Sequence, residues 1–275
     1  MAVPRRPPPR LGQHVLADRN ILERIVDALE PAPADVVIEI GAGSGTLTRV
    51  LAERVGRVIA IEKDVRLADK LREAESRKGE GVGVVGGDAL RLDWQALLHQ
   101  FLPLAPHPLP FKVVGNIPYQ ITTPLIERAL TPPLPQLVVF LVQAEVAVRL
   151  AARPGSKTYG ALSVGVQSVS QVERLFGVAA GAFQPPPKVR SAVVRLRPRP
   201  APLVDPGEVG RFRAFATACF SLRRKQLRNV LSAVTGNGPE RATAQLESLG
   251  IAATQRPETL TPEQFVQLFR GGAAG

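Results

Sequence analysis

The chain has 275 residues, of which 45% are hydrophobic, and its mean hydropathy is +0.05, values typical of a globular protein with one large and one small domain. No run of 18 apolar residues occurs, so no membrane-spanning helix is predicted, and the single cysteine, Cys219, excludes an internal disulfide. The net charge of +11 favours a polyanionic partner, nucleic acid first and an anionic membrane second.

The amino-terminal segment is rich in proline and arginine between Pro4 and Arg10. It lacks the apolar core of a secretory signal, and its prolines argue against an amphipathic targeting helix. We therefore expect residues 1–11 to form a flexible basic arm, and we expect the protein to be cytoplasmic.

Most of the following chain alternates between short apolar runs, typical of buried strands, and stretches with helical periodicity. The expected strands lie at residues 36–40, 58–61, 83–86, 113–115 and 137–142. The expected helices begin at or near Asp18, Leu47, Val65, Trp94, Thr122 and Ala144. Strands that alternate with helices at these spacings predict an α/β fold with a doubly wound, mostly parallel, Rossmann-like sheet.

The alternation becomes weaker after Tyr159. Two late strands are expected at residues 172–178 and 191–196, and the loop 183–188, which contains three consecutive prolines, separates them. We expect these strands to complete the large domain.

A proline-rich linker from Pro198 to Pro206 separates the large domain, residues 12–198, from a small helical domain at residues 207–275. Between Arg211 and Pro239 the small domain carries six basic residues and no acidic one. A basic face of this kind meets phosphates and gives binding that depends strongly on salt. We therefore predict an RNA-binding domain whose substrate contacts include the cluster Arg223, Arg224 and Lys225.

Three consecutive strands end in residues that suit an adenosine-containing ligand. The first runs into a glycine turn, residues 41–45, which lets a ligand approach the backbone closely. The second ends at Glu62, which can accept hydrogen bonds from ribose hydroxyls, and the third ends at Asp88, which can bind an adenine amine. Because no phosphate-gripping lysine turn or second glycine fingerprint occurs, S-adenosylmethionine fits these residues better than NAD.

The fourth strand runs into Asn116-Ile117-Pro118-Tyr119, at the edge of the sheet where α/β proteins bind their ligands. Asn116 offers an amide oxygen, Pro118 stiffens the backbone so that carbonyls can be aimed, and Tyr119 offers a flat ring. This combination suits a planar base with an exocyclic amine. Taken alone, the tetrapeptide fits equally well an ordinary strand-to-helix turn with a buried tyrosine.

Methyl transfer to such an amine requires alignment and charge stabilisation more than a strong base. Holding the amine hydrogens on Asn116 and on a backbone carbonyl, at Ile117 or Pro118, would localise a lone pair that the base otherwise delocalises. Tyr119 would stack on the base, and Phe183 is a candidate for the opposite face, though equally a candidate core residue. Asn116, Pro118 and Tyr119 are thus the predicted catalytic residues. No metal is required, and no Cys/His cluster occurs.

These motifs, in this order, resemble the KsgA family of ribosomal RNA adenine dimethyltransferases. The matching segments, besides the tetrapeptide, are Gly12–Leu16, Glu39–Gly43, Ile61–Asp64, Gly87–Ala89, Gln143–Val146, Tyr159–Val164, Phe183–Val189 and Arg223–Asn229. Each motif is modest, but the ordered set, which spans about residues 12–231, is specific.

The resemblance implies a methyltransferase that dimethylates the N6 amines of two adjacent adenines in a hairpin near the 3′ end of 16S ribosomal RNA, in small-subunit biogenesis. Its partner would be the small-subunit RNA or an assembling 30S particle, and the protein would be a monomer with no membrane association. The implied cofactor contacts, with their neighbours in the same motifs, are Gln13, His14, Leu16, Gly41, Gly43, Glu62, Asp88, Ala89 and Asn116.

Two positions depart from the family, since His14 stands where most members have Asn and Ile117 where most have Leu. The Asn-Ile-Pro-Tyr form also occurs in erythromycin-resistance methylases, which modify 23S RNA, so this function is the first alternative. The second is a non-catalytic, methylase-like RNA-binding assembly factor, although the intact set of Asn116, Glu62 and Asp88 argues against it. A DNA adenine methylase shares the amine chemistry, whereas the glycine spacing speaks against a dinucleotide oxidoreductase.

Overall fold

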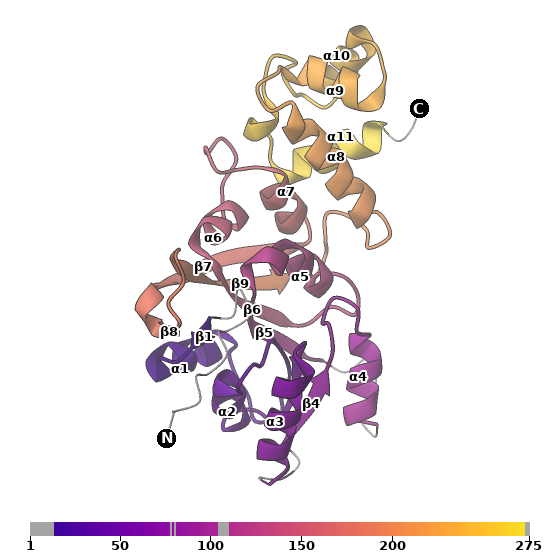
Figure 1. Ribbon diagram of the computed structural model, residues 1–275. Coiled ribbons are helices and arrows are strands. Elements are labelled where there is room, and N and C mark those ends of the chain that lie inside the picture. The colour runs from indigo at the N-terminus through magenta and orange to yellow at the C-terminus, as the bar shows by residue number, and fades with distance from the viewer. Residues whose placement is uncertain (1–13, 78, 80, 104–109, 273–275) are drawn as a thin grey trace. The chain divides into compact units, whose positions relative to one another are not determined.

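The computed structural model describes residues 14–77, 79, 81–103 and 110–272. A seven-stranded sheet has the strand order β4-β3-β2-β5-β6-β9-β7, and β1 and β8 form a separate two-stranded ribbon (Figure 1). The strands are β1 (Val15–Leu16), β2 (Val36–Ile40), β3 (Arg57–Glu62), β4 (Val82–Gly86), β5 (Lys112–Asn116), β6 (Leu137–Gln143), β7 (Ser170–Val178), β8 (Phe183–Gln184) and β9 (Ser191–Pro198).

Helices connect most of the strands. The α-helices are α1 (Arg19–Ala28), α2 (Thr46–Ala52), α3 (Val65–Ser76), α4 (Trp94–Phe101), α5 (Thr122–Ala129), α6 (Ala144–Leu150), α7 (Ala161–Gln167), α8 (Val209–Ser221), α9 (Leu227–Thr235), α10 (Pro239–Ser248) and α11 (Pro262–Gly272). Among the described residues, the 3-10 turns are η1 (Tyr119–Ile121), η2 (Ala180–Ala182) and η3 (Pro257–Thr259).

The pairs β2–β3, β3–β4, β2–β5 and β5–β6 are all parallel, which confirms the predicted doubly wound, Rossmann-like sheet. The order of the strands reverses between β2 and β5, because β3 and β4 extend the sheet on one side and β6 on the other. Residue Ile40 of β2 pairs with Ile61 of β3 and with Gly115 of β5, so the carboxyl ends of these strands lie side by side. Open α/β sheets bind ligands at this reversal point.

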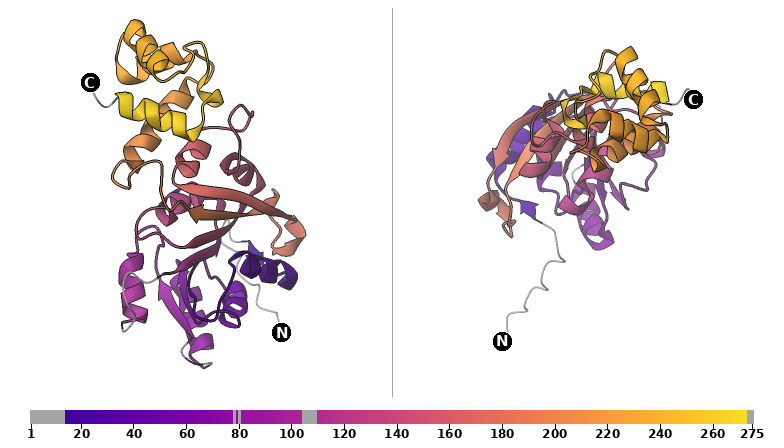
Figure 2. Two further views of the ribbon diagram at one scale, coloured as in Figure 1. Left: turned by 180° about the vertical axis from the view of Figure 1, so that it is seen from behind. Right: turned by 90° about the horizontal axis from the view of Figure 1, so that it is seen from above.

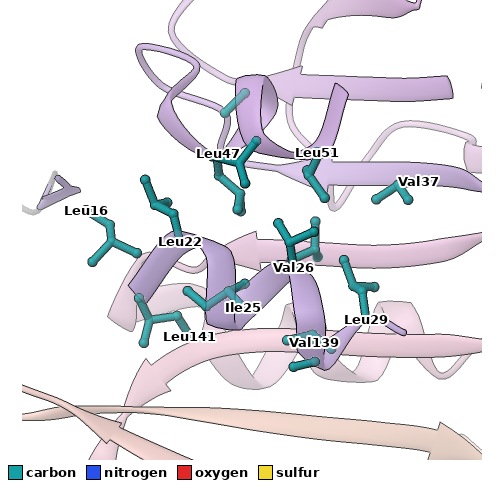
Figure 3. Close-up of a cluster of buried hydrophobic side chains, with 14 of the residues drawn as sticks. Leu16, Leu22, Ile25, Val26, Leu29, Val37, Leu47, Leu51, Val139 and Leu141 are labelled. Atoms are coloured by element: carbon teal, nitrogen blue, oxygen red, sulfur yellow. The ribbon is translucent and has the colours of Figure 1, made fainter. Parts of the chain in front are cut away.

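Helix α1 contributes one apolar face to the hydrophobic core that it shares with β2, α2 and β6 (Figure 3). Asp18 accepts hydrogen bonds from the amides of Asn20 and Ile21, which satisfies donors that the first turn leaves unpaired. Apolar residues then recur every three or four positions, so they share a face that packs against the sheet and α2. The buried side chains labelled there include Leu22, Ile25, Val26, Leu29, Val37, Leu47, Leu51, Val139 and Leu141.

The β1–β8 ribbon joins segments far apart in the chain. Val15 pairs with Gln184 and Leu16 with Phe183, and the amide of Ala17 donates to the carbonyl of Ala182 at 2.9 Å. The ribbon was not expected, because two-residue strands carry no periodicity. It brings the segment around His14 next to the proline loop that follows Phe183.

The expected strands lie within one or two residues of the observed ones, whereas helix α7 was not expected. Its seven residues are too few to give a clear helical pattern. None of the described helices is long and apolar enough to cross a bilayer.

The described chain divides into two compact units. Unit 1 contains residues to 129, 135–144 and 175–195, and unit 2 contains residues 130–134, 145–174 and those from 196 onward. In unit 2, α8, α9, α10 and α11 lie together at the orange and yellow end of the chain (Figure 2). The predicted arm, residues 1–11, lies outside the described residues, and the predicted domain ranges remain a prediction.

Candidate active site

A cavity of about 880 Å³ lies at the carboxyl ends of β2, β3, β4 and β5, within unit 1. Its lining brings together the glycine turn, the acids Glu62 and Asp88 at two strand ends, and the tetrapeptide 116–119. The predicted site residues that line it are His14, Leu16, Gly41, Gly43, Glu62, Asp88, Ala89, Asn116, Pro118 and Tyr119.

The glycine turn gives this cavity a backbone wall. Gly41, Gly43 and Gly45 have φ angles of +74°, +55° and +77°, a region that other residues rarely adopt. The amides of Gly41 and Ala42 both donate to the carbonyl of Ile61, which fastens the turn to the end of β3. These two hydrogen bonds fix the shape of the turn, and no side chain at Gly43 covers the backbone.

Glu62 is oriented by the turn itself. Its Oε2 accepts from the amide of Gly43 at 2.8 Å, and its Oε1 accepts from the amide of Asp64 at 2.8 Å. Each carboxylate oxygen keeps a further lone pair, so the group can still accept hydrogen bonds from a ligand's hydroxyls. These two hydrogen bonds therefore fix the orientation of the buried carboxylate.

Asp88 lies at the end of β4. Its Oδ2 accepts from Lys63 Nζ at 2.8 Å and its Oδ1 from the amide of Leu90 at 3.1 Å. The hydrogen bond from Lys63 and that from Leu90 hold the pKa of Asp88 below its ordinary value. Asp88 therefore stays ionised and acceptor-only, which suits an exocyclic amine better than a carbonyl group.

Glu39 is a further acid of this cavity to which the sequence analysis gave no role. It lies in β2, is 2% exposed, and its Oε2 has no hydrogen-bond partner among the described residues. Burial, and secondarily the charge of Glu62, raise the pKa of Glu39 to about 7, while Thr48 lowers it. The sequence did contain a sign of this residue, because Glu39 is the one charged residue within the apolar run 36–40.

Asn116 has one orientation fixed by its partner. Its Nδ2 donates to the carbonyl of His14 at 2.8 Å, and since a carbonyl oxygen only accepts, the amide nitrogen must face it. The oxygen Oδ1 is therefore directed elsewhere as an acceptor. In the same loop the carbonyl of Pro118 accepts from the amide of Ile121 at 3.1 Å, which leaves the carbonyl of Ile117 as the better candidate for a ligand's amine.

Tyr119 and His14 supply two rings near this loop. The Tyr119 hydroxyl lies 2.7 Å from Ser191 Oγ, and Ser191 is 1% exposed at the start of β9. The His14 ring centroid is 6.1 Å from that of Tyr119, with the planes tilted by 32°. His14 Nδ1 lies 2.8 Å from the carbonyl of Pro185, so Nδ1 carries the hydrogen and Nε2 is left with a lone pair in the neutral ring.

The remaining predicted site residues lie elsewhere. Gln13 is outside the described residues, and Phe183 is 2% exposed in the core cluster rather than in the cavity lining. Arg224 and Lys225 are exposed in unit 2, whereas Arg223 is paired with Glu258. No group of three or more potential metal ligands occurs within residues 14–77, 79, 81–103 and 110–272.

Comparison with known proteins places these features in a family. The model of the ribosomal RNA adenine dimethylase family matches residues 7–272. The protein named ribosomal RNA small subunit methyltransferase A from Rubrobacter xylanophilus is 43% identical over 269 residues, covering 96% of this chain and 95% of that protein. Its counterpart in Nitrosococcus oceani is 41% identical, covering 95% of this chain and 94% of that protein.

Solved structures give the same fold. The 23S rRNA methyltransferase ErmE is 31% identical with a TM-score of 0.70, covering 93% of this chain and 98% of that one. A dimethyladenosine transferase from Plasmodium falciparum is 27% identical with a TM-score of 0.79, covering 94% of this chain and 98% of that one.

Proposed function

The chain belongs to the ribosomal RNA adenine dimethylase family, and from this premise we propose that it dimethylates the N6 amines of two adjacent adenines in a hairpin near the 3′ end of small-subunit ribosomal RNA. The enzyme depends on S-adenosylmethionine. The assignment of roles rests on one observation, the fixed amide of Asn116 in the lining of a cavity that Glu62 and Asp88 also line.

The cavity residues fit this cofactor. Glu62 keeps acceptor capacity for ribose hydroxyls, Asp88 is held ionised for the adenine amine, and the turn around Gly43 exposes its backbone. The unpartnered Oε2 of Glu39, which also lines the cavity, adds an acceptor for a polar group of the cofactor. When bound, the cofactor supplies an electrophilic methyl group attached to a positively charged sulfur.

The protein's part in the transfer is to hold the target amine. Asn116 Oδ1 and the carbonyl of Ile117 would accept hydrogen bonds from the two N–H groups of the target amine. These hydrogen bonds favour a tetrahedral nitrogen with a localised lone pair. Positive charge that grows on the nitrogen then meets dipoles already in position. Tyr119, with its hydroxyl on Ser191, would stack on the base extruded from the hairpin. Alignment of this kind supplies much of the rate enhancement.

The RNA would be held by basic side chains of unit 2, of which Arg224 and Lys225 are exposed. Such contacts fix register on the phosphates but read little sequence. We infer that the substrate is the small-subunit RNA or an assembling 30S particle, and that the protein acts in the cytoplasm as a monomer.

The decisive experiment is transfer of labelled methyl groups to unmethylated small ribosomal subunits, with nucleoside analysis and mapping of the product on both ribosomal RNAs. We expect N6,N6-dimethyladenosine at two adjacent positions of the small-subunit RNA. Label on large-subunit RNA would instead support the function named for ErmE, which is the second candidate because of its structural similarity. Failure to bind S-adenosylmethionine in a calorimetric titration would reject both enzymes and leave a non-catalytic RNA-binding factor.

A further inference from the structure

The three basic residues that follow α8 in unit 2 differ in their surroundings. Arg224 and Lys225 are exposed, and neither forms an ion pair with a described residue. Arg223 is 36% exposed, its Nε forms an ion pair with Glu258 Oε2, and its Nη2 donates to the carbonyl of Ser156 at 3.4 Å. One member of the cluster thus faces the protein while its two neighbours face solvent.

We propose that Arg223 is a positioning residue that holds the turn between α8 and α9, residues 222–226, in shape. Arg224 and Lys225 of this turn, and Arg228 in α9, make the phosphate contacts. This inference rests on the proposed function, because it assigns separate roles within the basic cluster of an RNA-binding surface. The partner is a polyanionic RNA backbone.

Backbone contacts support the role of Arg223 as an anchor. The amide of Lys225 donates to the carbonyl of Leu222 at 2.8 Å, which closes the turn after α8. The amides of Leu227 and Arg228 donate to the carbonyls of Gln255 and Ala253 at 2.7 and 3.2 Å, which hold the start of α9 against residues 253–255. The turn is therefore fastened at its α9 end by backbone and at its α8 end by the Arg223 side chain.

Glu258 connects this anchor to a second loop. Its side chain pairs with Arg223, and its carbonyl accepts from the amide of Gly155 at 2.7 Å. Ser156, the next residue, supplies the carbonyl that Arg223 reaches. A guanidinium can serve both acceptors because its donors point in a fixed fork, which an ammonium lacks.

Electrostatics argue in the same direction. The charge of Arg223 is largely compensated by Glu258, so it adds little attraction for a phosphate. If Arg223 left Glu258 to meet RNA, it would leave behind a partly buried carboxylate facing a polyanion, at a cost that a surface contact does not recover. Arg224, Lys225 and Arg228 carry no such penalty.

The test is equilibrium binding of an unmethylated small-subunit ribosomal RNA transcript over a range of potassium chloride concentrations. The variants are Arg223→Gln, Glu258→Gln, Arg224→Gln and Lys225→Gln, each checked for folding by thermal unfolding. A side chain that neutralises one phosphate contributes about 0.7 to 0.9 to the slope of log K against log salt. We expect Arg224→Gln and Lys225→Gln each to reduce the slope by about this amount.

Arg223→Gln is expected to weaken binding by about fivefold at every salt concentration, equivalent to about 1 kcal/mol, while the slope stays unchanged. Glu258→Gln is the matched control. Because it removes a negative charge, simple electrostatics predicts that it binds RNA more tightly, whereas the loss of an anchor predicts no gain in RNA affinity. A reduced slope for Arg223→Gln, or tighter binding by Glu258→Gln, would overturn the inference. Unchanged slopes for Arg224→Gln and Lys225→Gln would instead contradict the RNA-binding surface in the proposed function.

Discussion

The orientation of a single amide decides what the Asn116 loop can do. Because Nδ2 donates to the carbonyl of His14, Oδ1 remains available as an acceptor, which is the role that we propose for it toward the target amine. Asn116→Ala removes that acceptor but leaves intact the basic residues of unit 2 that we propose to contact RNA. We expect kcat to fall by about 10²-fold or more, the range found when a preorganised polar group is deleted, with RNA affinity within about twofold. Steady-state methylation and equilibrium RNA binding measure the two quantities, and a parallel loss of both would refute this role.

Tyr119 contributes a ring rather than a charge. Tyr119→Ala should remove the stacking surface and weaken positioning of the target base by about 1–3 kcal/mol. Tyr119→Phe keeps the ring and loses only the hydroxyl contact with Ser191, so its effect should be smaller. Fluorescence of an RNA with 2-aminopurine at the target position reports stacking directly. Equal signals for the alanine variant and the unmodified enzyme would rule out stacking.

Glu39 makes the stability of the fold depend on pH. Its pKa of about 7 in the folded protein lies above the ordinary 4.5, so between these values the folded state holds a proton that the unfolded state has lost. Stability from this group is therefore fully present below about pH 4.5 and declines until about pH 7, by roughly 3 kcal/mol. Glu39→Gln should remove this decline. Urea unfolding at pH 5 and pH 8 tests this prediction. If the free energy of unfolding differed between the two pH values by the same amount in the variant and in the unmodified protein, the prediction would be wrong.

At the scale of residues, the sequence drew attention to Glu62, Asp88 and Asn116 because each lies at or just after the end of a predicted strand, and all three line the cavity. It gave no role to Glu39, which lies inside a strand. It could not predict contacts between distant segments, such as those of His14 with Pro185 or of Tyr119 with Ser191. Phe183 shows the same difficulty, since a phenylalanine before prolines fits a base pocket and a core equally well, and here it is in the core.

Among the elements, strand β5 sets the position of residues 116–119, the proposed catalytic loop, through Gly115. A Cβ added at Gly115 would lie 2.6 Å from the carbonyl oxygen of Ile40 and 2.8 Å from Ile117 Cδ1. Gly115→Ala should therefore push the end of β5 away from β2, lower stability by about 1–3 kcal/mol and reduce activity. Gly86→Ala is the matched control at the end of β4, because its nearest contact would be an ordinary 3.7 Å to Ala68. If both variants kept full activity, the exact placement of β5 would be unimportant.

The elements that sequence reasoning missed are short. Strands β1 and β8 have two residues each, and their pairing joins residues 167 and 169 positions apart rather than following a local pattern. Helix α7 has seven residues and ends at Gln167, whose side chain donates to the carbonyls of Leu150 and Ala152 at 2.8 Å. These elements are stabilised by tertiary contacts, and therefore no window of the sequence contains their cause.

In the molecule as a whole, the chain passes between the two compact units several times. Residues 145–174 belong to unit 2 although the sequence assigned them to the large domain, whose end was inferred from the proline linker. A linker of this composition marks an irregular segment, but which helices pack together depends on their apolar faces. Residues far apart share one core here, since Tyr159 contacts Phe220 with ring centroids 6.0 Å apart.

This packing predicts the outcome of dividing the chain. A fragment of residues 1–206 would expose Tyr159 and the apolar face of α7, whose Val164 and Val166 are 0% and 1% exposed in the intact protein. Exposing each of these side chains removes about 1.5–3 kcal/mol of favourable burial free energy, which is a large part of the stability of a typical domain. We expect this fragment to aggregate or to unfold well below the full chain, and a fragment of residues 207–275 to lack a stable fold for the same reason. Circular dichroism melting of both fragments and the full chain measures this, and cooperative unfolding of residues 1–206 at the temperature of the full chain would favour the linker as the true domain boundary.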